Sequence, residues 1–126
     1  MKKMNKSDSP KIAGIYIIVN TALNKVYIGQ SVDVFRRINQ HYQELQKGTH
    51  HNKDMQKDYN KSPSAFQWKI LQKCYLSQLN FYEKYYIKQY NSANPYYGYN
   101  HTKGGATKKR KNKDNRPTDL LDELTK

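Results

Sequence analysis

The sequence predicts an α+β fold in which a small three-stranded antiparallel sheet is flanked by helices. Two runs of β-branched and aromatic residues, separated by a five-residue turn, indicate a hairpin near the start of the chain. Apolar residues then recur at helical spacing in two segments, and a further strand and helix follow. The expected order is strand-strand-helix-helix-strand-helix. At 126 residues the chain is long enough for one domain and too short for two ordinary ones.

The first two strands form the predicted hairpin. Residues 12–19 and 25–30 are rich in residues that favour strands, and a polar turn joins them. Side chains alternate between the two faces of a strand, so the aliphatic residues of both strands point toward one core. Tyr16 and Tyr27 then share the opposite face with Ile18, which we expect to be only partly buried.

The third strand and the first helix follow from similar local patterns. Residues 65–74 alternate apolar and polar side chains, which is typical of a strand. Either Ser31 or Asp33 can cap a helix that continues to about Lys47, and Gly48 is its expected C-terminal stop. The predicted buried stripe of this helix consists of Val34, Ile38, Tyr42 and Leu45.

A shorter helix is predicted over residues 52–60, and the last helix from Ser77 to about Tyr90. Glu83 is the anomaly of this last helix, because it shares a face with apolar and aromatic residues. A carboxylate on an inward face needs a cation or a metal, since burying it unpaired is costly. The simpler alternative is a structural ion pair with a nearby Arg or Lys. The inward face is formed by Leu79, Tyr82, Tyr86, Ile87 and Tyr90.

Charge points to a polyanionic partner. Lysine and arginine outnumber acidic residues 23 to 10, giving a formal net charge of +13. On a small domain this favours nucleic acid binding, while a lysine-rich protein without such a partner is the alternative. We expect a flexible lead over residues 1–10, a folded domain over 11–105 and a basic, disordered arm over 106–126. The cations expected to contact nucleic acid are Arg36, Lys108, Lys109, Arg110, Lys111 and Lys113.

Other site classes find little support. Cys74 is the single cysteine, so the sequence offers no disulfide and no cysteine-based zinc site. The histidines show no pair at i,i+4 spacing, which argues against zinc. No apolar run approaches the ~20 residues of a membrane span, and residues 1–6 do not lead into a signal peptide. We therefore expect a cytoplasmic protein.

Several short motifs occur in the order that is typical of one nuclease family. Gly14-Ile15-Tyr16 and Tyr27-Ile28-Gly29 lie on the two strands of the hairpin. An arginine follows eight residues after the second tripeptide, and a histidine four residues later. With Glu83 and Gly98-Tyr99-Asn100 as further elements, the chain resembles the GIY-YIG nucleases over about residues 12–100. Within that family it is most similar to the catalytic domains of homing endonucleases encoded by phages and introns.

The resemblance implies metal-dependent hydrolysis of DNA phosphodiester bonds. Tyr27 would orient the attacking water, and His41 would accept its proton, because a phenol alone is a poor base near neutral pH. Tyr16 would form a hydrogen bond within the same cluster. Core aromatics with satisfied hydroxyls are the alternative for both tyrosines. Arg37 would neutralise a phosphate, unless it is only a solvated surface cation.

The resemblance also implies a metal site. Glu83 would be the single protein ligand of Mg²⁺ (or Mn²⁺), because magnesium keeps several waters and takes phosphate oxygens as ligands. His50 matches a further histidine of the family, and a phosphate contact is the more modest interpretation. Asn100 would hold the Glu83 region or a water in place; an ordinary turn asparagine is the alternative.

Three hypotheses remain open from the sequence. The first is an active endonuclease, the second an inactive nucleic-acid-binding protein of the same fold, and the third a basic structural protein. Few residues follow the motif region, so we expect low sequence specificity, or specificity from a homodimer or a partner.

Overall fold

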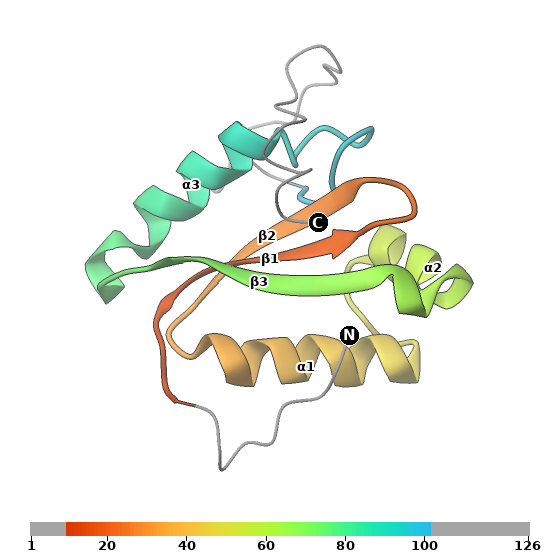
Figure 1. The fold of residues 1–126 in the computed structure, drawn as a ribbon, viewed down its shortest axis with the longest axis horizontal. Helices are drawn as coiled ribbons and strands as arrows, with labels where there is room; N and C mark the ends of the chain where they lie inside the picture. Colours follow the sequence, from red (N-terminus) through yellow and green to blue (C-terminus); the bar gives the residue numbers. More distant parts are fainter. Residues whose placement is uncertain (1–9, 102–126) are drawn as a thin grey trace.

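The computed structural model describes residues 10–101, and these residues follow the predicted order of elements (Figure 1). The three strands form one sheet, and each long helix packs against it. Two short 3₁₀ helices, η2 (Pro63–Ala65) and η3 (Leu76–Gln78), precede β3 and α3. The main elements are β1 (Gly14–Asn20), β2 (Lys25–Ser31), α1 (Val34–Lys47), α2 (Lys53–Lys61), β3 (Phe66–Lys73) and α3 (Leu79–Tyr90).

The sheet is antiparallel with strand order β2-β1-β3, as predicted. Tyr16 of β1 lies opposite Gly29 of β2, and Ile18 lies opposite Tyr27. All residues of β1 are buried, because this strand has a neighbour on each side and helices on both faces.

The helices cover both faces of the sheet, which the hairpin pattern did not predict. α3 packs with Ile15, Ile17 and Ile28 on one face. α1 and α2 cover the other face, where Tyr16 and Ile18 are buried. The expectation that Ile18 is partly exposed is therefore wrong, since its side chain is 0% exposed beneath the two helices. Figure 1 shows α3 and α1 on opposite sides of the sheet.

The helix ends confirm most of the local signals. The Asp33 side chain caps α1 by accepting a hydrogen bond from the Arg36 backbone, and Gly48 ends this helix with a φ of 76°, in the left-handed region. α3 begins at Leu79 instead of being capped by Ser77, because residues 76–78 form the 3₁₀ turn η3.

The buried face of α1 also differs from the prediction. His41 is fully buried, whereas Tyr42 is only half-buried. The inward stripe runs through Val34, Ile38, His41 and Leu45, so Tyr42 lies at its edge.

The segment after α3 returns to the edge of β2. Val26 donates to the carbonyl of Tyr97 (3.1 Å), and Tyr99 donates to the carbonyl of Val26 (2.9 Å). This short parallel pairing brings Asn100 beside β2. Among the helices within residues 10–101, none is both long and apolar enough to cross a membrane.

Candidate active site

A pocket of about 210 Å³ opens beside β2, where α3 and two loops meet. Tyr27, Glu83 and Asn100 lie far apart in the sequence but line this one pocket. The structure thus brings together a phenol, a carboxylate and an amide that the sequence analysis had singled out. The remaining lining residues are His51, Asn52, Ile87 and His101.

Glu83 is held at the pocket by β2. Its carboxylate accepts a hydrogen bond from the Gln30 side chain (3.1 Å). Burial raises the pKa of the Glu83 carboxyl, and hydrogen bonding to Gln30 opposes that rise. No cation within residues 10–101 lies at ion-pair distance from Glu83. The structural ion pair that was the simpler alternative is therefore absent from this part of the chain.

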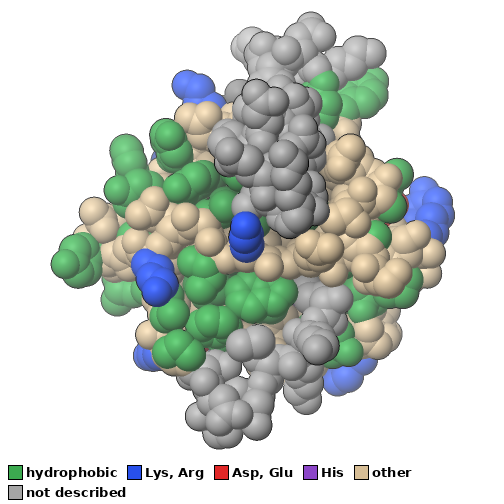
Figure 2. All heavy atoms as spheres, viewed as in Figure 1, with side chains coloured by type: hydrophobic (Ala, Val, Ile, Leu, Met, Phe, Trp, Pro, Cys, Tyr) green, Lys and Arg blue, Asp and Glu red, His purple; other side chains and the backbone are tan. Residues whose placement is uncertain are grey.

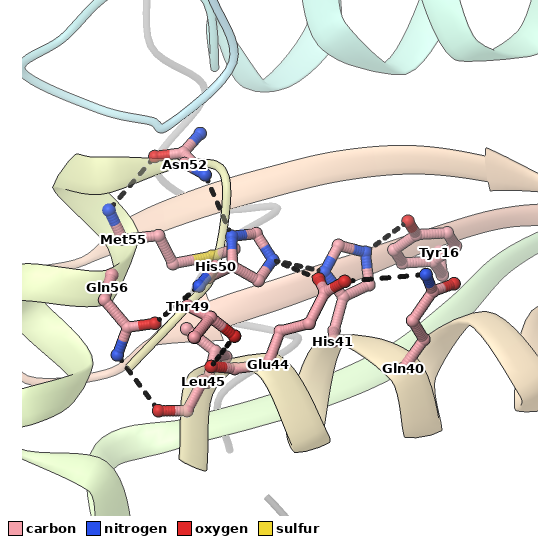
Figure 3. Close-up of polar contacts among 10 residues, drawn as sticks. All are labelled: Tyr16, Gln40, His41, Glu44, Leu45, Thr49, His50, Asn52, Met55 and Gln56. Atoms are coloured by element: carbon pink, nitrogen blue, oxygen red, sulfur yellow. Dashed lines mark hydrogen bonds and ion pairs between the residues drawn. The ribbon is translucent and has the colours of Figure 1, made fainter. Parts of the chain in front are cut away.

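Tyr16 and His41 form the buried side of the candidate site. The Tyr16 hydroxyl lies 2.7 Å from His41 Nε2, and His41 Nδ1 lies 2.7 Å from His50 Nε2 (Figure 3). The Tyr27 ring packs against Tyr16 and His41, with ring centroids 6.5 and 5.5 Å away. Six of the predicted site residues are thus in contact with one another or line the same pocket.

Arg37 supplies the positive charge beside these rings. Its charge acts on both phenols and opposes the rise in the pKa of Tyr16 and Tyr27 that burial causes. Among the residues that the structure describes, no carboxylate pairs with Arg37. A half-buried guanidinium without an acidic partner is well suited to a phosphate.

Gly29 shows why the second tripeptide needs a glycine. A Cβ atom at this position would lie 2.3 Å from the hydroxyl oxygen and from Cζ of Tyr16. Any side chain at Gly29 would therefore displace the Tyr16 hydroxyl from His41.

Asn100 is fixed to β2 beside the pocket. Its side-chain amide accepts from the Ile28 N–H (2.9 Å) and donates to the Ile28 carbonyl (2.8 Å). Both bonds go to the strand whose Gln30 binds Glu83. The expected role of Asn100 in holding the Glu83 region or a water stays a prediction.

Burial keeps the two inner histidines neutral. It lowers the pKa of His41 to about 2, with Arg37 as the next cause. It lowers the pKa of His50 to about 4, and the neighbouring His51 adds to this effect. His50 is fully buried. A histidine on an exposed loop that contacts phosphate was the more modest expectation, and burial does not agree with it.

His41, Glu44 and His50 also form a group whose ligand atoms lie within 4.8 Å of one another. Sequence spacing could not reveal this group, because the two histidines are nine residues apart. Magnesium prefers oxygen ligands, so this group fits Mg²⁺ poorly. The two imidazoles moreover bond to each other at 2.7 Å, and a metal would have to break that bond. Glu44 Oε1 is buried without a hydrogen-bond partner and lies 4.0 Å from His50 Nε2.

The predicted DNA-contacting cations are only partly described. Arg36 is exposed on α1. The other predicted cations lie outside the described residues: Lys108, Lys109, Arg110, Lys111 and Lys113. The predicted lead over residues 1–10, apart from Pro10, and the predicted arm over residues 106–126 also lie outside them. On the face in Figure 2, basic side chains are spread over the surface with few acidic side chains between them. The sequence did not predict that Gln30, Asn52 and Gln56 support the site, because no motif marks these residues. The position of Asn52 just before a helix, where asparagine commonly caps, is the one local signal that could have indicated a role for it.

Comparison with known proteins confirms the resemblance. A family model described as the GIY-YIG catalytic domain matches residues 12–100. The chain is 38% identical over 82 residues to Intron-associated endonuclease 1 of Enterobacteria phage T4. This match covers 64% of the chain and 34% of the phage protein, so the chain spans about a third of the length of that relative.

Solved structures of the catalytic domain of intron endonuclease I-TevI are similar in fold and in sequence. A mutant of that domain matches with a TM-score of 0.66 and 33% identity, covering 77% of this chain and 98% of the other. A second structure matches with a TM-score of 0.65 and 34% identity, covering 71% and 98%. Because the family model spans most of the chain and these similar domains are covered almost completely, the chain belongs to the GIY-YIG catalytic domain family.

Proposed function

We propose that the protein is a metal-dependent DNA endonuclease that hydrolyses phosphodiester bonds at the pocket beside β2. The observation that carries the proposal is the convergence of Glu83 and Tyr27 on one pocket. Arg37, which has no acidic partner within residues 10–101, acts on the same phenol. The family membership supports it, as do the relatives, which are named as endonucleases.

Glu83 is the residue that would hold the metal, Mg²⁺ or Mn²⁺. It fits this role because its carboxylate is oriented by Gln30, has no cationic partner in the described part of the chain and lines a pocket with room for water. Mg²⁺ commonly binds proteins through one or two carboxylates and keeps several waters. When bound, such an ion would polarise a phosphodiester oxygen and lower the pKa of a bound water.

The remaining residues would bind and orient the reactants. Arg37 would neutralise a non-bridging phosphate oxygen. The Tyr27 hydroxyl would orient the attacking water. The hydrogen bond of His41 goes to Tyr16, so His41 contacts Tyr27 only through the packing of the two rings.

Binding of DNA would draw on the excess positive charge. Arg36 and the basic residues at 108–113 would contact phosphates, which supplies affinity but little sequence recognition. We therefore propose that target selection comes from a homodimer or a further partner.

Nicking of a supercoiled plasmid tests the proposal. Wild-type protein should nick in the presence of Mg²⁺ or Mn²⁺ and stop when EDTA is added. Glu83→Gln should lower the rate by more than about 100-fold. Asp54→Asn removes an exposed carboxylate on α2 and should leave the rate unchanged. DNA binding without any nicking by the wild type would instead support an inactive binding protein of the same fold.

A further inference from the structure

Four residues form a line of hydrogen bonds that ends at a backbone amide (Figure 3). The Asn52 N–H donates to His50 Nδ1 at 3.0 Å. His50 Nε2 lies 2.7 Å from His41 Nδ1, and His41 Nε2 lies 2.7 Å from the Tyr16 hydroxyl. All four residues are at least 98% buried, so water does not compete for these bonds.

The direction of each bond follows from the amide at the end of the line. A backbone N–H can only donate, so His50 Nδ1 must carry a lone pair. A neutral imidazole has one N–H, which in His50 must then be at Nε2. His50 therefore donates to His41 Nδ1, and the hydrogen of His41 must be at Nε2, where it points to Tyr16.

We propose that the backbone N–H of Asn52 sets the tautomers of His50 and His41, so that His41 is a hydrogen-bond donor to Tyr16 and not its proton acceptor. The opposite direction is blocked, because a hydrogen at His50 Nδ1 would face the Asn52 N–H, donor against donor. The catalytic consequence rests on the proposed function, whereas the tautomers do not.

For the reaction, this means that Tyr16 accepts a hydrogen bond from His41. The Arg37 guanidinium, whose charge opposes the rise in the pKa of Tyr16, cannot accept a hydrogen bond either. The hydrogen of the Tyr16 hydroxyl then has neither group as an acceptor and must point to a third one. A proton released at Tyr27 cannot leave through the line of histidines and has to leave through the open side of the pocket.

Asn52 is a positioning residue that is fixed from several sides. Its Oδ1 caps α2 by accepting from the Met55 N–H (3.0 Å), and its Nδ2 donates to the Tyr99 carbonyl (2.6 Å). Gln56 fixes the neighbouring backbone, because its Oε1 accepts from the His50 N–H at 3.0 Å. These bonds hold the Asn52 amide against the imidazole of His50.

Nuclear magnetic resonance of ¹⁵N-histidine-labelled protein in EDTA reads the tautomers directly. We expect His50 Nδ1 and His41 Nδ1 to resonate as unprotonated nitrogens and both Nε2 atoms as protonated ones, with signals assigned through single histidine variants. Protonated Nδ1 in either ring would overturn the proposal, whether or not the protein cleaves DNA.

Two variants test the amide. Asn52→Ala and Asn52→Pro both lose the side-chain bonds, but only Asn52→Pro loses the N–H. Proline is compatible with the φ of −84° at this position, and its Cδ atom takes the place of the hydrogen, so this variant both removes the donor and pushes against His50 Nδ1. We expect the Asn52→Ala spectrum to keep the wild-type tautomers, and Asn52→Pro to show a mixture and to nick DNA at least about tenfold more slowly than Asn52→Ala.

His50→Gln gives an independent check if the proline variant does not fold. A glutamine amide can still donate to His41 Nδ1, so the His41 tautomer should persist in this variant and be lost in His50→Ala. Identical His41 signals in folded His50→Gln and His50→Ala would overturn the proposal. Plasmid nicking by the wild type is scored separately, so a failure of the proposed function is distinguishable from a failure of the tautomer assignment.

Discussion

Lowering the pH from 7 to 5 should destabilise the protein through His41 and His50. Both pKa values are depressed in the folded state, from an ordinary value of 6.5 to about 2 and about 4. A group with a depressed folded pKa stabilises the fold above its unfolded pKa, and that stability is lost as the pH falls toward the folded value. The loss therefore begins near the unfolded pKa, because the unfolded histidines bind protons and the folded ones do not.

The magnitude follows from these values. Between pH 7 and pH 5 an unfolded histidine with a pKa of 6.5 gains most of a proton, which costs the folded state about 2 kcal/mol for each histidine. Together, the two residues should lower the free energy of unfolding by about 4 kcal/mol. Other groups also titrate in this interval, and burial raises the pKa of Glu83, which acts in the opposite direction.

A comparison of the wild type with His50→Gln removes those other contributions. Urea unfolding is followed at both pH values by the fluorescence of Trp68, the single tryptophan, which packs against Phe35. The free energy of unfolding of the wild type should fall by about 2 kcal/mol more than that of the variant. Equal decreases in the two proteins would refute the reasoning, because they would mean that His50 titrates alike in the folded and unfolded states.

Gly29→Ala should destabilise the fold by about 1–3 kcal/mol and slow plasmid nicking, because the new Cβ would overlap the Tyr16 hydroxyl. Gly48→Ala is the matched control, because no atom lies within 4 Å of its added Cβ. The strain of its positive φ should lower the stability of the fold, but the rate of nicking should stay close to that of the wild type. Asn100→Ala removes two hydrogen bonds to β2 and should lower the free energy of unfolding, measured in urea, by about 1–3 kcal/mol. A decrease smaller than a few tenths of a kcal/mol would contradict the role of Asn100 in holding that strand. Deletion of residues 106–126 should weaken DNA binding and reduce its dependence on salt while metal-dependent nicking persists, and an unchanged salt dependence would exclude a DNA-contacting role for that segment.

The parts of the fold that the sequence predicted are those with local signals. The alternation of side chains along the two hairpin strands predicted that Tyr16 and Tyr27 share one face of the sheet. The capping residues Asp33 and Gly48 predicted where α1 begins and ends. Alternation separates two faces but does not say whether a helix covers each of them. For this reason Ile18 was expected to be partly exposed, although α1 and α2 bury it completely.

The candidate site was predictable in its motif residues and not in the contacts between them. Glu83 was singled out as an inward carboxylate, but its partner Gln30 belongs to another element and carries no motif. The bonds from Asn52 to His50 depend on the path of the loop after α1, which no periodic pattern encodes. Asn100 was found by its motif, yet its attachment to β2 requires the parallel pairing that only the folded chain shows.

Binding of Mn²⁺, followed by electron paramagnetic resonance in the presence of a DNA duplex, tests most directly whether Glu83 is the metal ligand. The free Mn²⁺ signal should decrease with about one ion bound per wild-type chain, beyond what the duplex binds alone. Asp54→Asn should bind like the wild type, and Glu83→Gln should show only the binding of the duplex. Equal Mn²⁺ binding by the wild type and Glu83→Gln would contradict the account, because the ion would then be held elsewhere.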